Sequence, residues 1–231
     1  MNRGTNVIAL VEGQTESLFV KNILAPYLAE REIFIEPIML HKKGQSGGDV
    51  KFLRAIQDIG NHLRQRRDTC VTLMVDYYGL DPEWPGFAEA KLSAAHTDKA
   101  KIINQATAKI VQEHFPEENR GYRFIPYISM HEIEALYFSC AKTLAGMINI
   151  KPNEIEKILL KYGKAEAIDD GFDTAPSKRL TNLFPHFKKT VTGISIAQNI
   201  GVGKMREACP LFNDWVGRLE NLPTPYEVTA E

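Results

Sequence analysis

Residues 6–16 read NVIALVEGQTE, and residues 70–78 read CVTLMVDYY. Each stretch begins with a continuous apolar run rich in β-branched residues and then changes to an acidic residue. Such runs are typical of strands that are covered on both faces in the centre of a parallel sheet. We therefore expect two central strands, one ending at Glu12 and the other at Asp76.

The segments around these two strands alternate between helix-like and strand-like patterns. Thr15 is a candidate N-cap for a helix from Glu16 to about Glu30, in which Pro26 predicts a kink or an early end. Further strands are expected at residues 33–40 and 122–128, and helices after residue 50, at residues 99–114 and from His131 onward. Alternation of this kind favours an α/β fold with a parallel, doubly wound sheet flanked by helices.

The pattern changes beyond residue 150 to short helices. These helices are interrupted at Gly163, at residues 169–176, and at Pro185, Gly201 and Gly203. We therefore expect an α/β domain at residues 1–147 and a small C-terminal helical subdomain at residues 148–231 that packs on it.

Composition narrows the class of protein. The 231 residues are 44% hydrophobic and 25% charged, which is typical of a globular protein with a sizeable core. A net charge of −1 argues against coating nucleic acid by bulk electrostatics but leaves room for a local basic patch. Three widely spaced cysteines fit reduced thiols and a cytoplasmic protein. The apolar run at residues 7–11 is too short for a signal peptide, and we expect no membrane span.

The two strand ends predict an acidic pocket. Ligands of parallel sheets bind outside the carboxyl ends of the strands, so Glu12 and Asp76 should face the same crevice. Glu16 lies four residues after Glu12 and can join them at the start of the helix. Three clustered carboxylates repel one another unless a cation compensates, and Mg²⁺ or Mn²⁺ prefers such oxygen ligands. Alternatively, Glu16 only complements the helix dipole and Asp76 is a turn residue.

Two groups of polar residues could complete such a site. His131, Glu132 and Glu134 follow the fourth expected strand. On an α-helix the two glutamates lie about 200° apart, so only one of them should face the pocket. His131 is a candidate general acid or base, or alternatively a capping or core residue.

Two other segments supply candidate phosphate contacts. The first is the glycine-rich loop at residues 41–49, which contains Lys43. The second is the run Ser177, Lys178 and Arg179 after Pro176. The alternatives are a solvated basic loop and an ordinary helix start. Tyr77, Tyr78 and Trp84 suit either packing or stacking on a base.

The runs VIALVEGQTE and LMVDYY resemble the Toprim superfamily of primases, topoisomerases and overcoming-lysogenization-defect nucleases. The first Toprim motif is an apolar strand, Glu-Gly and an acid four positions after the Glu, as in Glu12, Gly13 and Glu16. The runs MHEIEALYFS, DTAPSKRL and IGVGKMREACPLFNDWVGRLE are similar to a bacterial family catalogued as domain of unknown function 4276, a Toprim relative. This resemblance covers nearly the whole chain.

The resemblance implies a Toprim-like (Rossmannoid) fold and a divalent-metal-dependent phosphodiesterase, a nuclease acting on DNA or RNA. It implies Mg²⁺ or Mn²⁺ held by Glu12 and Asp76, with Glu16 as ligand or general base and with Glu134 or Glu132 joining the site. A partner ATPase and a role in phage defence are also implied.

The second motif departs from the superfamily pattern. Toprim proteins usually have Asp-x-Asp there, whereas this chain has Asp76, Tyr77 and Tyr78. Asp81, or Glu132 and Glu134, could supply the missing acid. The alternative function is a non-catalytic binding or regulatory module with a degenerate metal site.

Overall fold

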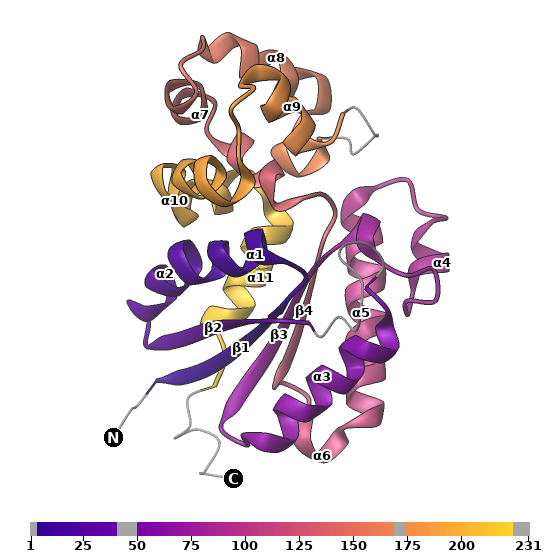
Figure 1. The fold of residues 1–231 in the computed structure, drawn as a ribbon. Coiled ribbons are helices and arrows are strands. Elements are labelled where there is room, and N and C mark those ends of the chain that lie inside the picture. Colours follow the sequence, from indigo (N-terminus) through magenta and orange to yellow (C-terminus); the bar gives the residue numbers. More distant parts are fainter. Residues whose placement is uncertain (1–3, 41–49, 169–173, 224–231) are drawn as a thin grey trace.

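The computed structural model describes residues 4–40, 50–168 and 174–223. Its centre is a four-stranded parallel sheet in the order β2-β1-β3-β4 (Figure 1). The strands are β1 (Thr5–Val11), β2 (Ile33–Met39), β3 (Thr69–Asp76) and β4 (Phe124–Ser129). The predicted α/β fold with two buried central parallel strands is therefore confirmed.

The sheet separates two hydrophobic cores. Val7 and Ala9 of β1 contribute to one core, whereas Ile8 and Leu10 contribute to the other. Successive side chains of a strand point to opposite faces, so a strand that is apolar throughout needs cover on both sides. This requirement explains why residues 6–11 show no polar alternation.

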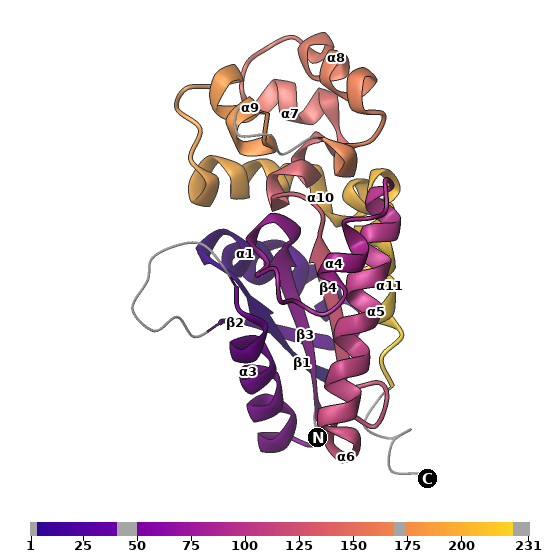
Figure 2. The ribbon, with the colours of Figure 1, turned by 90° about the vertical axis from the view of Figure 1, so that its right-hand side faces the viewer.

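Helices cover both faces of the sheet and one of its ends (Figures 1 and 2). One face carries α1 (Gln14–Phe19), the π-helical η1 (Val20–Leu24), α2 (Ala25–Ala29), α10 (Ile194–Ala208) and α11 (Pro210–Glu220). The other face carries α3 (Phe52–Gln65), α4 (Phe87–Ala90), α5 (His96–His114) and α6 (Pro116–Asn119). Beyond the carboxyl ends of the strands lie η3 (Ile133–Ser139), α7 (Ala141–Met147), α8 (Pro152–Tyr162), η4 (Ala165–Ala167), α9 (Pro176–Leu183) and η5 (Lys189–Gly193). No helix in the described ranges is long and apolar enough to cross a membrane.

The helix after β1 differs from the prediction at its start. Gly13, not Thr15, is the N-cap, because the extended Gly13 backbone leads directly into Gln14 and its carbonyl accepts the Ser17 amide at 3.1 Å. The helical path then continues through Pro26 to Ala29, with a π-helical segment before the proline. Proline has no backbone N–H to donate to the preceding turn. The wider π-helical turn accommodates the missing hydrogen bond, so the helix does not end there.

Two other predicted elements change as well. No α-helix starts at His131. A 3₁₀ helix starts at Ile133 instead, and the extended backbone of Cys140 separates it from α7. The helix expected at residues 99–114 begins earlier, at His96, and the short helix α4 precedes it.

The C-terminal segment is joined to the sheet by specific polar contacts. The indole of Trp215 donates to the Thr72 hydroxyl of β3 at 2.8 Å and stacks on Tyr127 of β4 with ring centroids 4.4 Å apart. Glu166 accepts the Leu211 and Phe212 amides at the start of α11. The Trp215 contacts hold α11 on the sheet, and the Glu166 bonds join η4 to α11 within the C-terminal part. The predicted domain boundary at residue 147 stays a prediction.

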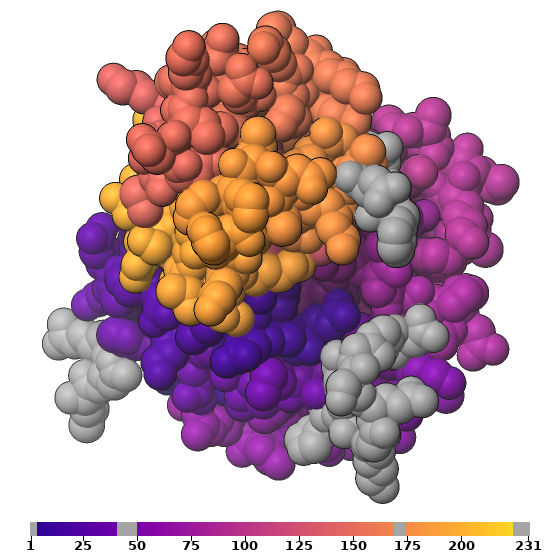
Figure 3. Space-filling view, turned by 45° about the horizontal axis from the view of Figure 1, so that its top comes forward, coloured from indigo at the N-terminus to yellow at the C-terminus, as the bar shows by residue number. Residues whose placement is uncertain are grey.

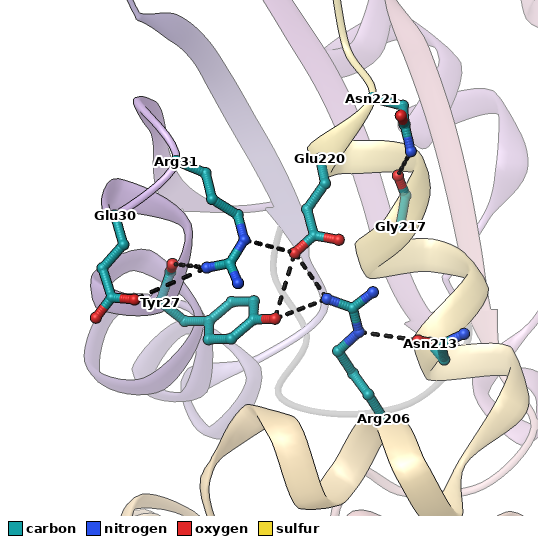
Figure 4. A network of polar contacts seen from close by, with 8 residues as sticks. All are labelled: Tyr27, Glu30, Arg31, Arg206, Asn213, Gly217, Glu220 and Asn221. Atoms are coloured by element: carbon teal, nitrogen blue, oxygen red, sulfur yellow. Dashed lines mark hydrogen bonds and ion pairs between the residues drawn. The ribbon is translucent and has the colours of Figure 1, made fainter.

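A polar network fixes α2, α10 and α11 together (Figure 4). The Arg206 guanidinium donates to Glu220 and to the Tyr27 hydroxyl, both at 2.7 Å, and to Asn213 at 2.9 Å. Arg31 reaches the same Glu220 oxygen at 2.9 Å. Since Arg206 and Glu220 are mostly buried, losing the arginine leaves several polar groups without a partner.

Arg206→Met should lower the free energy of unfolding by about 1.5–3 kcal/mol, the usual contribution of hydrogen bonds to charged groups. Urea unfolding followed by circular dichroism measures this loss. The matched control is Lys204→Met on the same helix, which removes an exposed pair with Glu207 and should leave the free energy of unfolding nearly unchanged. Equal effects of the two substitutions would contradict the structural role of the network.

Candidate functional site

The predicted site residues gather at the carboxyl end of the sheet. Val11 of β1 pairs with Met74 of β3, and Asp76 pairs with Ser129 of β4. The chain therefore leaves three adjacent strands at one edge. Glu12 follows β1, Asp76 ends β3, and Glu132 comes three residues after β4.

Asp76 is the electrostatic centre of this edge. Burial raises the pKa of its carboxyl well above the usual range, and the charges of the surrounding carboxylates raise it further. The neighbours that act on it are, from strongest to weakest, Glu16, Glu12, Glu134 and Glu132. The structure thus brings Glu12, Glu16, Glu132 and Glu134 near Asp76, and we name these five carboxylates the acidic cluster.

Two glycines allow the first two glutamates to fold back toward the strand ends. A Cβ atom added to Gly79 would lie 3.0 Å from Oε2 of Glu12, and one added to Gly13 would lie 3.1 Å from Oε2 of Glu16. Both distances are tighter than ordinary van der Waals contact. The Glu12 side chain therefore lies against the turn after β3, which links the first and second acidic motifs physically.

Glu132 is held by three donors from the C-terminal part of the chain. Its carboxylate accepts the Ser177 amide and hydroxyl, both at 2.9 Å, and the Lys189 ammonium at 2.7 Å. Burial alone would raise the pKa of Glu132, but the bonds from Lys189 and Ser177 outweigh it and lower the pKa. The predicted phosphate contact Ser177 therefore serves Glu132 in this structure.

Glu134 is the most buried acid of the cluster, with only 1% of its side chain exposed. Burial raises its pKa to about 7, although Lys189 at 3.5 Å opposes the shift. Within the described residues, Oε1 of Glu134 accepts no hydrogen bond. A buried acceptor without a donor is costly, so this oxygen is suited to an incoming cation or protonated group.

The prediction that only one of Glu132 and Glu134 faces the pocket is wrong. Both carboxylates approach the Lys189 ammonium, and both act on Asp76. The estimate of about 200° assumes an α-helix. Glu132 instead has an extended backbone just before the helix, and Glu134 lies in a 3₁₀ helix, so the α-helical angle does not apply.

Lys189 forms ion pairs with two of these acids, Glu132 and Glu134. The sequence did not indicate this cation. Burial works to lower its pKa, but Glu134 and Glu132 outweigh burial and raise it, so Lys189 stays charged at neutral pH. It lies 113 positions after Asp76 in an unremarkable Lys-Lys pair. The only available signal was the general need for a positive charge among several carboxylates.

The remaining predicted residues lie in varied surroundings. Arg179 donates to the Thr174 carbonyl at 2.7 Å and to the Tyr162 hydroxyl at 2.5 Å. These bonds hold its side chain against nearby segments of the same chain. Lys178 is exposed on α9. His131 is 2% exposed, and its ring lies edge-on to His96 with centroids 4.9 Å apart. Lys43 lies outside the described residues.

The aromatic residues near Asp76 divide into two kinds. Tyr77 and Trp84 are buried, at 6% and 2% exposure, and they pack in the core below α4. Tyr78 is 59% exposed. Asp81, an alternative second acid, instead accepts the Glu83 amide at 2.9 Å and is not among the main influences on the pKa of Asp76.

The oxygen donors of the cluster fit a hard divalent cation in chemical type. In the described part of the chain, no three or more His, Cys, Asp or Glu side chains are arranged closely enough to hold a metal ion as they stand. The fit therefore rests on two other observations. These are the raised pKa of Asp76 among four carboxylates and the buried Glu134 oxygen that lacks a donor.

Fold and site together define an α/β protein with a parallel sheet and an acidic cluster at the carboxyl ends of its strands. The chain belongs to the family described as domain of unknown function (DUF4276), whose model matches residues 11–220. Comparison with curated proteins and with solved structures found no match.

Asp76→Asn should stabilise the protein by about 0.5–2 kcal/mol at pH 8 without divalent metal, since it removes a charge that four carboxylates repel. Folding raises the pKa of Asp76, so the residue costs more stability as the pH rises from its unfolded pKa of about 3.9 toward its folded pKa. Below about pH 3.9 the residue is protonated in both states and the gain should vanish.

Urea unfolding in EDTA at several pH values measures this gain. The matched control is Asp81→Asn, which alters an acid five positions along the chain but outside the acidic cluster, and which should give no gain. A loss of stability in Asp76→Asn at pH 8 would show that the carboxylate is compensated and not repelled.

Proposed function

We propose that the protein is a divalent-metal-dependent phosphodiesterase, a nuclease that acts on DNA or RNA and is related to Toprim proteins. Glu12, Glu16, Asp76 and Glu134 would hold Mg²⁺ or Mn²⁺. One observation carries the proposal: Asp76, at the carboxyl end of a central parallel strand, has its pKa raised first by burial and then by four other carboxylates around it. A cation is the most direct means of relieving that repulsion.

Such an ion, when bound, polarises a phosphate and lowers the pKa of an attacking water molecule. The protein's own residues supply the rest. The Lys189 ammonium can donate to a phosphate oxygen and oppose the charge that develops there. Glu132 orients Lys189 through the contact of 2.7 Å and is itself fixed by Ser177. Glu16, partly exposed beside Gly13, is placed to act as ligand or general base, and His131 is the candidate acid.

The second candidate function is a binding or regulatory module without catalysis. It is favoured by the contacts of Lys189, a cation of the protein itself that compensates Glu132 and Glu134. The exposed Tyr78 in place of a second aspartate points the same way. A module of this kind would bind metal or nucleic acid and leave it intact.

A partner ATPase and a role in phage defence rest on the Toprim resemblance alone. We propose them on that basis. Co-purification of the tagged protein from its native cells would detect a stable ATPase partner.

Purified protein should cleave labelled DNA or RNA, single- or double-stranded, in Mg²⁺ or Mn²⁺ and not in EDTA. Asp76→Asn and Glu12→Ala should each reduce the rate at least ~100-fold, since each removes a metal ligand. Gel electrophoresis of the end-labelled products measures the rates.

Asp81→Asn is again the matched control and should retain the wild-type rate. Equal cleavage by wild-type protein and Asp76→Asn would indicate a contaminating nuclease and contradict the proposal. Metal-dependent binding without cleavage by any of the proteins would favour the non-catalytic module.

A further inference from the structure

Tyr78 occupies a distinct position at the edge of the acidic cluster. It is the middle residue of the 3₁₀ turn η2 (Tyr77–Gly79) that follows β3. Asp76 precedes this turn, and Gly79 within it lies against the Glu12 carboxylate. Consecutive Cα atoms are about 3.8 Å apart, so the Tyr78 backbone is within ~8 Å of Asp76. Any phosphate bound at the cluster would therefore lie near this side chain.

The Tyr78 ring is supported by other rings. Its centroid lies 5.2 Å from that of Tyr77 in an edge-to-face arrangement and 6.1 Å from that of His131 at 31°. Tyr77 in turn stacks on Phe87 at 5.4 Å, and His131 lies edge-on to His96. Tyr77 and His131 are buried, which limits the positions that the Tyr78 ring can take. An aromatic group that is already positioned loses little conformational entropy when it binds a ligand.

Exposure and chemistry together indicate what such a ring would bind. More than half of the Tyr78 side chain is exposed, unlike the neighbouring Tyr77 and Trp84, which pack in the core. An exposed ring beside the acidic cluster is free to stack on a flat ligand group, which a ring packed in the core cannot do. In nucleic acids, the groups that stack on aromatic side chains next to a bound phosphate are the nucleobases. A base can stack on a protein side chain only when it is unpaired and outside the helical stack.

Tyr78 and the Lys189 ammonium lie around the same acidic residues. The Tyr78 ring contacts His131, and the next residue, Glu132, binds Lys189 at 2.7 Å. Lys189 belongs to the C-terminal part of the chain, whose residues, in orange, lie next to the first residues, in indigo (Figure 3). A nucleic acid strand bound at the cluster would thus have both an ammonium and an aromatic ring nearby.

We propose that Tyr78 is a stacking platform for an unpaired nucleobase next to the phosphate bound at the acidic cluster. The preferred ligand is accordingly a single strand or an unpaired end. This inference rests on the proposed function only in that the cluster binds nucleic acid; it does not require cleavage. It also gives a role to the residue that replaces the second aspartate of the Toprim pattern.

Binding should be measured by fluorescence anisotropy with single-stranded oligonucleotides and with blunt duplexes of the same sequence. The measurements use Ca²⁺ in place of Mg²⁺, so that the acidic cluster keeps a hard cation with oxygen ligands, and gel electrophoresis of the recovered oligonucleotide checks that it stays intact. Tyr78→Ala should weaken single-strand binding about 5- to 150-fold, which corresponds to the ~1–3 kcal/mol of one stacked base. Tyr78→Phe and Tyr78→Trp, which keep an aromatic ring, should bind within about twofold of the parent protein.

A single abasic position moved along the oligonucleotide locates the stacked base. At one position its effect should be large with Tyr78 present and small in Tyr78→Ala, since the ring and the base are the two halves of one contact. Phe34→Ala, which removes a 41%-exposed aromatic ring near the amino end of β2, should leave binding unchanged. Thermal unfolding of each variant confirms that it is folded.

Four results would overturn the inference. These are no binding of single strands, an equal loss of single-strand and duplex binding in Tyr78→Ala, unchanged binding in Tyr78→Ala, and a Tyr78→Phe variant as weak as Tyr78→Ala. The outcome is separable from that of the nuclease proposal. Tyr78-dependent binding without cleavage supports the platform and contradicts the nuclease, whereas cleavage that is indifferent to Tyr78 does the reverse.

Discussion

The repulsion among five carboxylates at one end of a parallel sheet is the constraint on which the site depends. Burial raises the pKa of Asp76, and the repulsion by the other four carboxylates raises it further. The protein compensates part of it from a distant segment, where the Lys189 ammonium contacts Glu132 and Glu134. Ordinary cores avoid such arrangements because unpaired buried charge is destabilising. Its presence here indicates selection for something other than stability, as is common at binding and catalytic sites.

The fold explains why these charges meet. In a parallel sheet every strand ends at the same edge, so acids that are far apart in sequence come together without any local motif. The return of the chain through α10 and α11 completes the arrangement. Trp215 fixes α11 to the sheet and Arg206 joins α10 to α2 and α11, so the segment that carries Lys189 is held against the first half of the chain.

Sequence alone predicted the sheet and the acidic cluster well, because both follow from simple patterns. Uninterrupted apolar runs indicate buried parallel strands, and an acid after such a run lies at the strand end. The errors came from irregular backbone. The 3₁₀ helix after β4 places Glu132 and Glu134 together against the α-helical expectation, and Gly13 takes the capping role assigned to Thr15. Lys189 could not be found, because a cation that arrives through tertiary structure leaves no local pattern.

The central claim is that the acidic cluster is a metal site. It is tested most directly by a crystal of the protein soaked in Mn²⁺, with anomalous scattering recorded at the manganese absorption edge. A peak about 2.0–2.6 Å from carboxylate oxygens of Asp76 and Glu12 is the predicted result. A fully occupied peak elsewhere, or no peak while Lys189 keeps its contacts with Glu132 and Glu134, would contradict it.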